Sequence, residues 1–239
     1  MAVAAASLPE LSAARPGLSA HGAARAQPVA MAGERLLPVL PVLEPLFPAG
    51  GLRRGSVVSV TGSTSLAMSL LAAASGQGSW CAAVGLPSLG LAAAAELGVA
   101  LERFPLVPSP GRAAGAGGWG WVVAALVDAF DVVLARPPAH LKGADARRLT
   151  ARARERGAVL VLSGNGWPEA AEVQLSVASA VWEGVGQGHG RLRARRVEVV
   201  AGGRGAAARE RRLALWLPHP DGGLREVVDG RAHARRVVS

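Results

Sequence analysis

The sequence predicts an α/β protein with a mainly parallel sheet, flanked by helices and extended by antiparallel strands at its C-terminal edge. From residue 56 to residue 162, short apolar runs typical of buried strands alternate with helix-like runs, which is the pattern of βαβ units. After Trp167 only strand-like segments follow, separated by glycine-rich turns. With 239 residues, half of them apolar, the chain is long enough for one core with tails.

The chain enters the predicted sheet through an extended segment over residues 36–43, because Pro38 and Pro41 forbid a regular helix there. A valine-rich stretch then predicts a buried strand over residues 56–60. The small residues 61–65 indicate a loop, and the apolar run after them predicts a helix over residues 66–74.

This strand–helix pattern repeats along the middle of the chain. Gly98 and Gly157 mark the ends of two helices, and Pro108 follows a short strand. We expect strands over residues 80–84, 106–107, 131–135 and 158–162, and helices over residues 91–97, 119–129 and 145–156. Alternation of strands and helices implies right-handed βαβ crossovers, and strands joined in this way are parallel.

The C-terminal part predicts three strands, over residues 172–182, 190–200 and 212–217. On the middle strand, arginines alternate with Leu192 and Ala194, so the arginines should share the outer face while the apolar side chains face the core. Either this basic stripe contacts phosphate or a partner protein, or it is a solvated strand face. The candidate contact residues are Arg191, Arg193, Arg195 and Arg204.

Charge and composition divide the chain into three parts. Residues 1–30, rich in Ala, Pro and Arg, predict a disordered arm, residues 31–228 form the domain, and residues 229–239 a basic flexible tail. Lys and Arg outnumber Asp and Glu by 26 to 17, a net charge of +9. The last quarter carries most of this excess, which suggests contact with nucleic acid or an acidic partner, or a solvated surface.

Targeting and metal signals are weak. Residues 55–95 carry no charge, but glycines and serines divide them into pieces too short to cross a membrane, so we expect a cytoplasmic protein. One cysteine, Cys81, cannot form an internal disulfide or a zinc cluster, and we expect no metal. The tryptophans Trp80, Trp167, Trp182 and Trp216 stand at strand ends, where we expect them to be buried. Trp119 and Trp121 are expected in the core or, alternatively, as a partner anchor.

The loop after the first strand of a parallel sheet is the usual phosphate site. A working P-loop reads G-x-x-x-x-G-K-[ST], with a lysine on the phosphates and a hydroxyl on magnesium. Alanine and methionine replace the second glycine and the lysine here, so the loop is a degenerate nucleotide site. It comprises Gly62, Ser63, Thr64, Ser65, Leu66, Ala67, Met68 and Ser69.

Several stretches resemble the core of the RecA recombinases. Residues 50–58, the loop after them, residues 96–99 and the strand from Asp131 run in RecA order. Within that superfamily the chain is most similar to the actinobacterial ImuA-type proteins. Their marks are the stretches GGLRRG, GSW, DARRL and WP at residues 50–55, 78–80, 145–149 and 167–168. The resemblance covers roughly residues 36–217 and implies a RecA-like P-loop core.

The resemblance also shows which catalytic positions are changed. Arg136 stands where the family orders magnesium with an aspartate, and its charge would repel the metal. The stretch from Gly85 to Pro87 stands where a catalytic glutamate is expected. With the lysine position occupied by Met68 as well, we expect no ATPase activity and no cofactor.

For a family member of this kind, the resemblance implies a non-catalytic adaptor in SOS-induced translesion synthesis. Its implied partners are RecA, an inactive Y-family polymerase homologue and an error-prone DnaE-type polymerase, with weak non-specific DNA binding besides. The alternatives are an ATP-dependent RecA-like recombinase paralogue and a DNA-binding or cell-division-inhibitor protein on the same scaffold.

Overall fold

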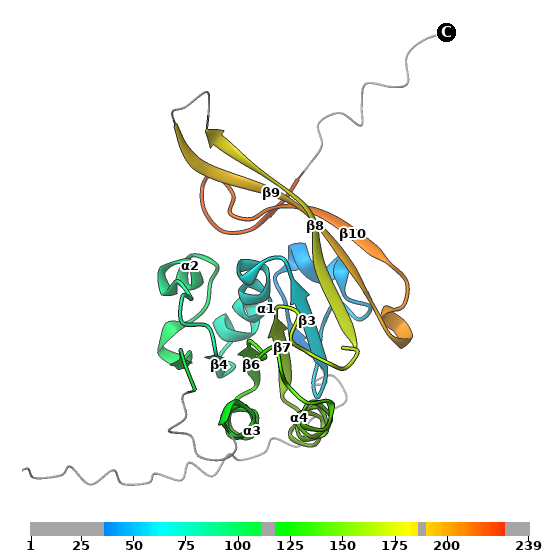
Figure 1. The fold of residues 1–239 in the computed structure, drawn as a ribbon. Coiled ribbons are helices and arrows are strands. Elements are labelled where there is room, and N and C mark those ends of the chain that lie inside the picture. Colours follow the sequence, from blue (N-terminus) through cyan, green and yellow to red (C-terminus); the bar gives the residue numbers. More distant parts are fainter. Residues whose placement is uncertain (1–35, 111–117, 186–189, 228–239) are drawn as a thin grey trace, which may run out of the picture.

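The computed structural model describes residues 36–110, 118–185 and 190–227 (Figure 1). In these residues a nine-stranded sheet runs in the order β11-β10-β9-β8-β3-β7-β6-β4-β5. Its strands are β3 (Val57–Thr61), β4 (Cys81–Val84), β5 (Leu106–Val107), β6 (Val132–Ala135), β7 (Val159–Ser163), β8 (Val173–Val185), β9 (Gly190–Gly203), β10 (Arg211–Trp216) and β11 (Arg225–Glu226). The predicted arm at residues 1–30 and the tail at residues 229–239 lie outside the described residues.

Within the described ranges, four α-helices cover the sheet, with 3-10 turns between elements. The helices are α1 (Thr64–Gly76), α2 (Leu91–Glu96), α3 (Gly118–Ala129) and α4 (Gly143–Arg156). The 3-10 turns are η1 (Pro41–Leu46), η2 (Leu101–Arg103) and η4 (Gly205–Ala207), and a separate two-stranded sheet pairs β1 (Leu36–Pro38) with β2 (Gly51–Arg53).

Each face of the sheet has its own core. On one face, buried residues of α1 and α2 pack against alternate residues of the central strands, among them Val58 and Leu134. On the other face, α3 and α4 pack against the intervening residues, among them Leu160 and Val133. Because successive strand residues point to opposite faces, nearly every residue of the central strands is buried.

The fold class predicted from the sequence is confirmed. Strands β8, β3, β7, β6, β4 and β5 are parallel, and β9, β10 and β11 add antiparallel pairs. Strand β8 joins the two parts, since it is parallel to β3 and antiparallel to β9. One half of the long β8–β9 hairpin is part of the sheet, and the other half extends past the helices (Figure 1).

Two local predictions need correction. Residues 36–43 do not stay extended, because Pro41 starts the 3-10 turn η1, whose geometry also tolerates Pro45. Helix α1 begins at Thr64 instead of Leu66, because Ser63 caps it. On α4, the apolar residues Ala146, Leu149 and Ala153 are buried, and the arginines lie on the opposite side.

Several apolar side chains expected in the core are exposed. Trp80 and Trp182 are 50% and 48% exposed, and Leu192 is 56% exposed. Trp121 on α3 is also exposed, whereas Trp119 is half-buried. Trp80 precedes β4 and its ring contacts only the edge of Phe130 among the described aromatic rings, and Trp182 lies on the far half of β8, so a position near a strand end did not by itself predict burial.

Cys81 lies wholly inside the core on β4, as expected for packing. Burial, with a smaller contribution from the charge of Asp131, raises the pKa of its thiol to about 12. The thiol is therefore protonated at neutral pH and a poor nucleophile. None of the helices in the described residues is long and apolar enough to span a membrane.

Candidate functional site

The loop after β3 lies at the place where open parallel sheets bind ligands. β3 is central, with β8 on one side and β7 on the other, and all three are parallel. From β3 the chain crosses toward β4, whereas from β7 it crosses the other way, to β8. The carboxyl end of β3 is therefore a topological switch point, the usual position of a nucleotide site.

The geometry of this loop differs from a phosphate cradle. Only Gly62 and Ser63 separate β3 from α1. The Ser63 hydroxyl accepts a hydrogen bond from the Leu66 backbone N–H at 3.2 Å, and the Ser63 carbonyl accepts one from Ala67 N–H. Residues that would surround a phosphate in a P-loop here form the cap and first turn of a helix.

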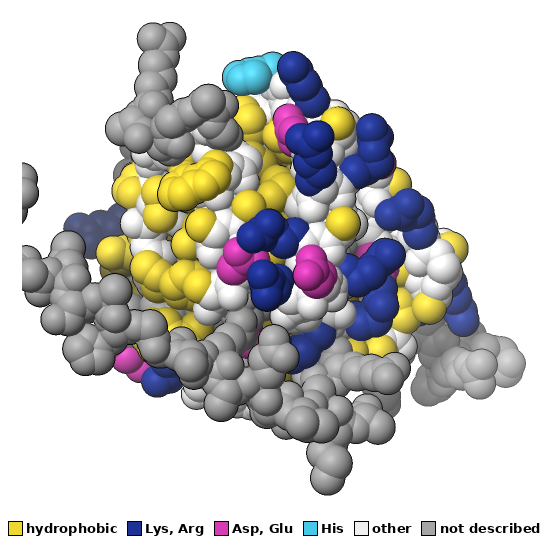
Figure 2. Space-filling view, turned by 90° about the horizontal axis from the view of Figure 1, so that it is seen from below, with side chains coloured by type: hydrophobic (Ala, Val, Ile, Leu, Met, Phe, Trp, Pro, Cys, Tyr) yellow, Lys and Arg dark blue, Asp and Glu magenta, His cyan; other side chains and the backbone are white. Residues whose placement is uncertain are grey.

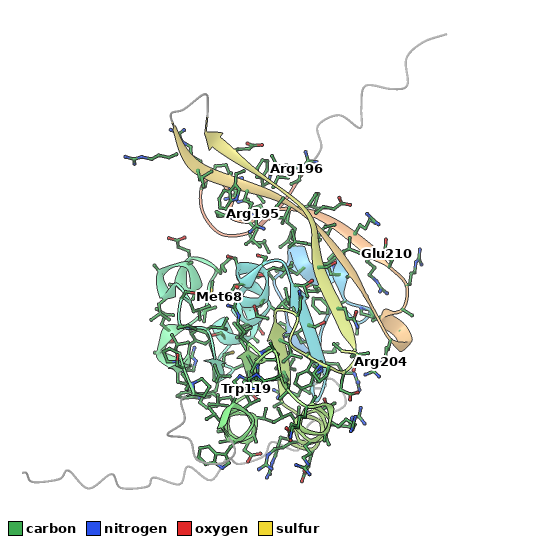
Figure 3. All side chains as sticks on the ribbon, in the orientation of Figure 1. Met68, Trp119, Arg195, Arg196, Arg204 and Glu210 are labelled. Carbon is green, nitrogen blue, oxygen red and sulfur yellow. The ribbon has the colours of Figure 1, made fainter. Side chains whose placement is uncertain are left out.

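The side chains at the lysine and magnesium positions point into the protein. Met68 is 2% exposed and belongs to the core between α1 and the sheet (Figure 3). The Ser69 hydroxyl is buried and donates to the Leu66 carbonyl at 2.8 Å. A lysine at position 68 or a metal-binding hydroxyl at position 69 would thus face the core in this conformation.

Arg136 lies against the start of α1. Its Nη2 donates a hydrogen bond to the Thr64 hydroxyl at 3.0 Å, and its backbone N–H bonds to Val84. Gly85, at the expected glutamate region, has a positive φ of 75°, and a Cβ there would lie 3.0 Å from the Arg136 carbonyl. The structure thus brings the Arg136 guanidinium to Thr64, in the degenerate loop.

The four candidate arginines fall into two separate places. Arg191, Arg193 and Arg195 lie on the far half of β9, whereas Arg204 follows its other end (Figure 3). Arg204 follows Arg195 by nine positions, about 30 Å along an extended strand. Leu192 does not face the core as predicted and is 56% exposed, whereas Ala194, on the same side of the strand, is buried.

Arg204 belongs to a second group, at the amino ends of the strands. Two adjoining cavities of about 190 and 420 Å³ share Arg204, Ser56 and Glu172 in their walls. Glu172 accepts a hydrogen bond from Arg53 Nε at 2.8 Å, so one carboxylate already balances part of this charge.

Most arginines of α4 are paired. Asp128 on α3 accepts hydrogen bonds from Arg152 and Arg156, and the bond from Arg152 is the main reason that its pKa is lowered. Seen from below, basic and acidic side chains lie side by side over this face (Figure 2). We interpret the α4 arginines as a solvated, ion-paired face. The residues that the structure describes contain no cluster of three potential metal ligands.

Sequence reasoning missed the exposed apolar residues beside the arginine stripe. Val181, Trp182 and Leu192 are exposed on the same part of the hairpin. Arg195 lies over the Trp182 ring, with its Cζ 5.7 Å from the ring centroid. Alternation predicted the two faces of the strand but could not indicate that Leu192 is exposed while Ala194 is buried.

Two comparisons place the chain among known proteins. A family model described as the MT3502 N-terminal domain matches residues 45–169, a range that includes the degenerate loop and α4 but stops before β8. The chain is 37% identical over 125 residues to the uncharacterized protein Rv3395c of Mycobacterium tuberculosis (strain ATCC 25618 / H37Rv). This alignment covers 51% of the chain and 59% of the relative, so the chain spans about six tenths of the relative's length.

Proposed function

The chain belongs to the MT3502 N-terminal domain family, and from this premise we propose that it is a non-catalytic adaptor in SOS-induced translesion synthesis. The resemblance to ImuA-type proteins supplies the partners: RecA, an inactive Y-family polymerase homologue and an error-prone DnaE-type polymerase. An adaptor of this kind works in the cytoplasm, at the nucleoid after DNA damage.

The observation that supports a non-catalytic role most directly is the closed first loop. Met68 is buried, Ser63 caps α1, and Arg136 donates to Thr64 at the switch point. Phosphoryl transfer needs phosphate positioning and a metal ion together. Loss of the lysine, the acidic metal ligand and the cradle removes both contributions, and the scaffold that remains is suited to recognition.

The nucleotide prediction separates this proposal from an ATP-dependent recombinase paralogue. We expect no magnesium-dependent ATP hydrolysis above background and a Kd for ATP weaker than about 1 mM, near −4 kcal/mol. Calorimetric titration checks this, with a RecA protein measured in parallel as the positive control. Micromolar ATP binding would contradict the proposal and favour the recombinase alternative.

The adaptor function itself is tested by co-precipitation with each of the three purified partners after nuclease treatment. We expect the complexes to persist, because protein contacts provide the specificity. The arginines of β9 should add only weak, salt-sensitive DNA affinity. Complexes that disappear with the nucleic acid would identify a DNA-binding protein instead.

A further inference from the structure

The far half of the β8–β9 hairpin, here called the arm, consists of residues 178–184 and 190–196. Every residue in 178–184 and 190–193 is exposed. In Figure 1 this part extends past the helices that cover the rest of the sheet. The core therefore does not explain the composition of the arm.

The arm exposes apolar side chains at some cost in solvation. Val181 is 60% exposed, Trp182 48% and Leu192 56%. Three large apolar side chains close together on an uncovered ribbon are typical of an interaction site. Trp182 in particular belongs to the residue types that dominate binding energy at interfaces.

The backbone of β8 is open along the same stretch. Arg195 donates its backbone N–H to Pro218 and accepts from Leu217 N–H, at 3.0 and 2.7 Å, so both groups point away from β8. Its register partner Trp182 therefore sits in a non-hydrogen-bonded pair, with its own N–H and C=O pointing away from β9. Ala180, two residues earlier and opposite Val197, has the same orientation.

No described strand covers this outward edge. Strand β3 pairs with β8 only as far as Ser176, opposite Thr61. The outward groups of Ala180 and Trp182 lie beyond that point. An open edge of this kind is a template for an added strand.

The charge of the arm is positive, with four arginines against one glutamate, Glu183. The side chains of two of these arginines lie beside residues of β8. Arg195 lies over the Trp182 ring, and a Cβ placed on Gly184 would lie 3.0 Å from Arg193 Cγ. The Arg195 guanidinium therefore lies beside Trp182, a residue of the open edge, where a negatively charged ligand is favoured.

From these observations we infer that the arm binds an extended acidic segment of a partner protein, which adds as a strand to the edge of β8 at Ala180 and Trp182. An open backbone edge and exposed aliphatic side chains suit a peptide, whereas nucleic acid uses neither. Alternate side chains of the added strand would lie beside Trp182 on one face. On the other face they lie beside Val181, next to a cavity of about 420 Å³ that Val181 lines with Arg196 and Arg212.

This inference rests on the proposed adaptor function only in taking the partner to be a protein. The test uses the full chain and fluorescence anisotropy with three labelled probes: the peptide acetyl-(Glu-Val)₄-amide, its (Lys-Val)₄ counterpart and a dT₁₅ oligonucleotide. An eight-residue strand of about 26 Å is long enough to cover the open edge. We expect saturable binding of the acidic peptide and none of the basic one.

Three variants should weaken acidic-peptide binding about tenfold or more: Ala180→Pro, Trp182→Ala and Arg193→Glu. Ala180→Pro is the sharpest, since it removes an outward N–H and leaves the ladder to β9 in place. The matched charge control is Arg209→Glu, an exposed arginine outside the arm, which should bind like the wild type. Thermal unfolding shows whether each variant is folded. If Ala180→Pro is not folded, Arg193→Glu provides the test of the arm in its place.

The inference is overturned if the acidic peptide does not bind up to 1 mM, or if the three arm variants bind it as the wild type does. Tighter binding of dT₁₅, lost in the same variants, would also overturn it and assign the arm to nucleic acid. Because this assay contains neither RecA nor a polymerase, a negative result would not contradict the adaptor function, which the co-precipitation test decides.

Discussion

Replacing Gly203 by alanine should lower the free energy of unfolding by about 3 kcal/mol or more. Gly203 ends β9 with φ of +151°, a conformation that side chains rarely adopt. A Cβ there would lie 2.1 Å from the Glu172 carbonyl oxygen. That carbonyl cannot easily move, because it accepts the Arg204 N–H at 3.0 Å and precedes the register pair of Val173 with Gly203.

The adjacent residue gives a matched control. A Cβ on Gly202 would meet nothing within 4 Å, and its φ is not in the positive range. Gly202→Ala should therefore leave the free energy of unfolding within about 0.5 kcal/mol of the wild type. Urea denaturation of both variants at 25 °C checks the pair, and equal destabilisation by the two would disprove the steric explanation.

Leu160→Ala should cost about 2–5 kcal/mol. Leu160 is fully buried on β7, in register with Val57 of β3 and Val133 of β6. Its side chain packs in the core beneath α3 and α4, and strands on both sides hold the backbone in place. The site therefore cannot collapse around the missing methyl groups, and a cavity remains.

Leu192→Ala is the corresponding control, since it makes the same chemical change at a side chain that is 56% exposed. Its effect on the free energy of unfolding should stay within about 0.5 kcal/mol. Urea unfolding with equal m-values for both variants isolates the change in the native core. A loss at Leu192 as large as that at Leu160 would show that the arm packs against the domain.

The order of the elements could be predicted from the sequence, because strands and helix ends have local sequence signals. Valine-rich runs such as residues 56–60 and the glycine stop at Gly157 are short-range signals, and neither depends on distant neighbours. The starts of helices were less predictable. α1 begins two residues early because one hydroxyl, on Ser63, satisfies the Leu66 N–H, and a serine–threonine run offers several such caps.

The candidate site, too, could be predicted from the sequence only in part. The sequence alone showed that Met68 and Arg136 replace a lysine and an acid. It did not show that Met68 is packed in the core or that Arg136 reaches Thr64. The second fact joins residues 72 positions apart in the chain, and only the placement of β6 in the sheet with respect to β3 brings them together.

The exposed arm shows what a local sequence pattern cannot predict. By itself the sequence determined that Arg191, Arg193 and Arg195 share a strand face, because alternation is a property of any extended backbone. Whether a face is buried depends on what lies across from it. Strand β3 stops pairing with β8 at Ser176, and the described helices do not reach the arm. Only the tertiary structure could decide that Trp182 and Leu192 face solvent, because burial depends on neighbours that the local sequence does not specify.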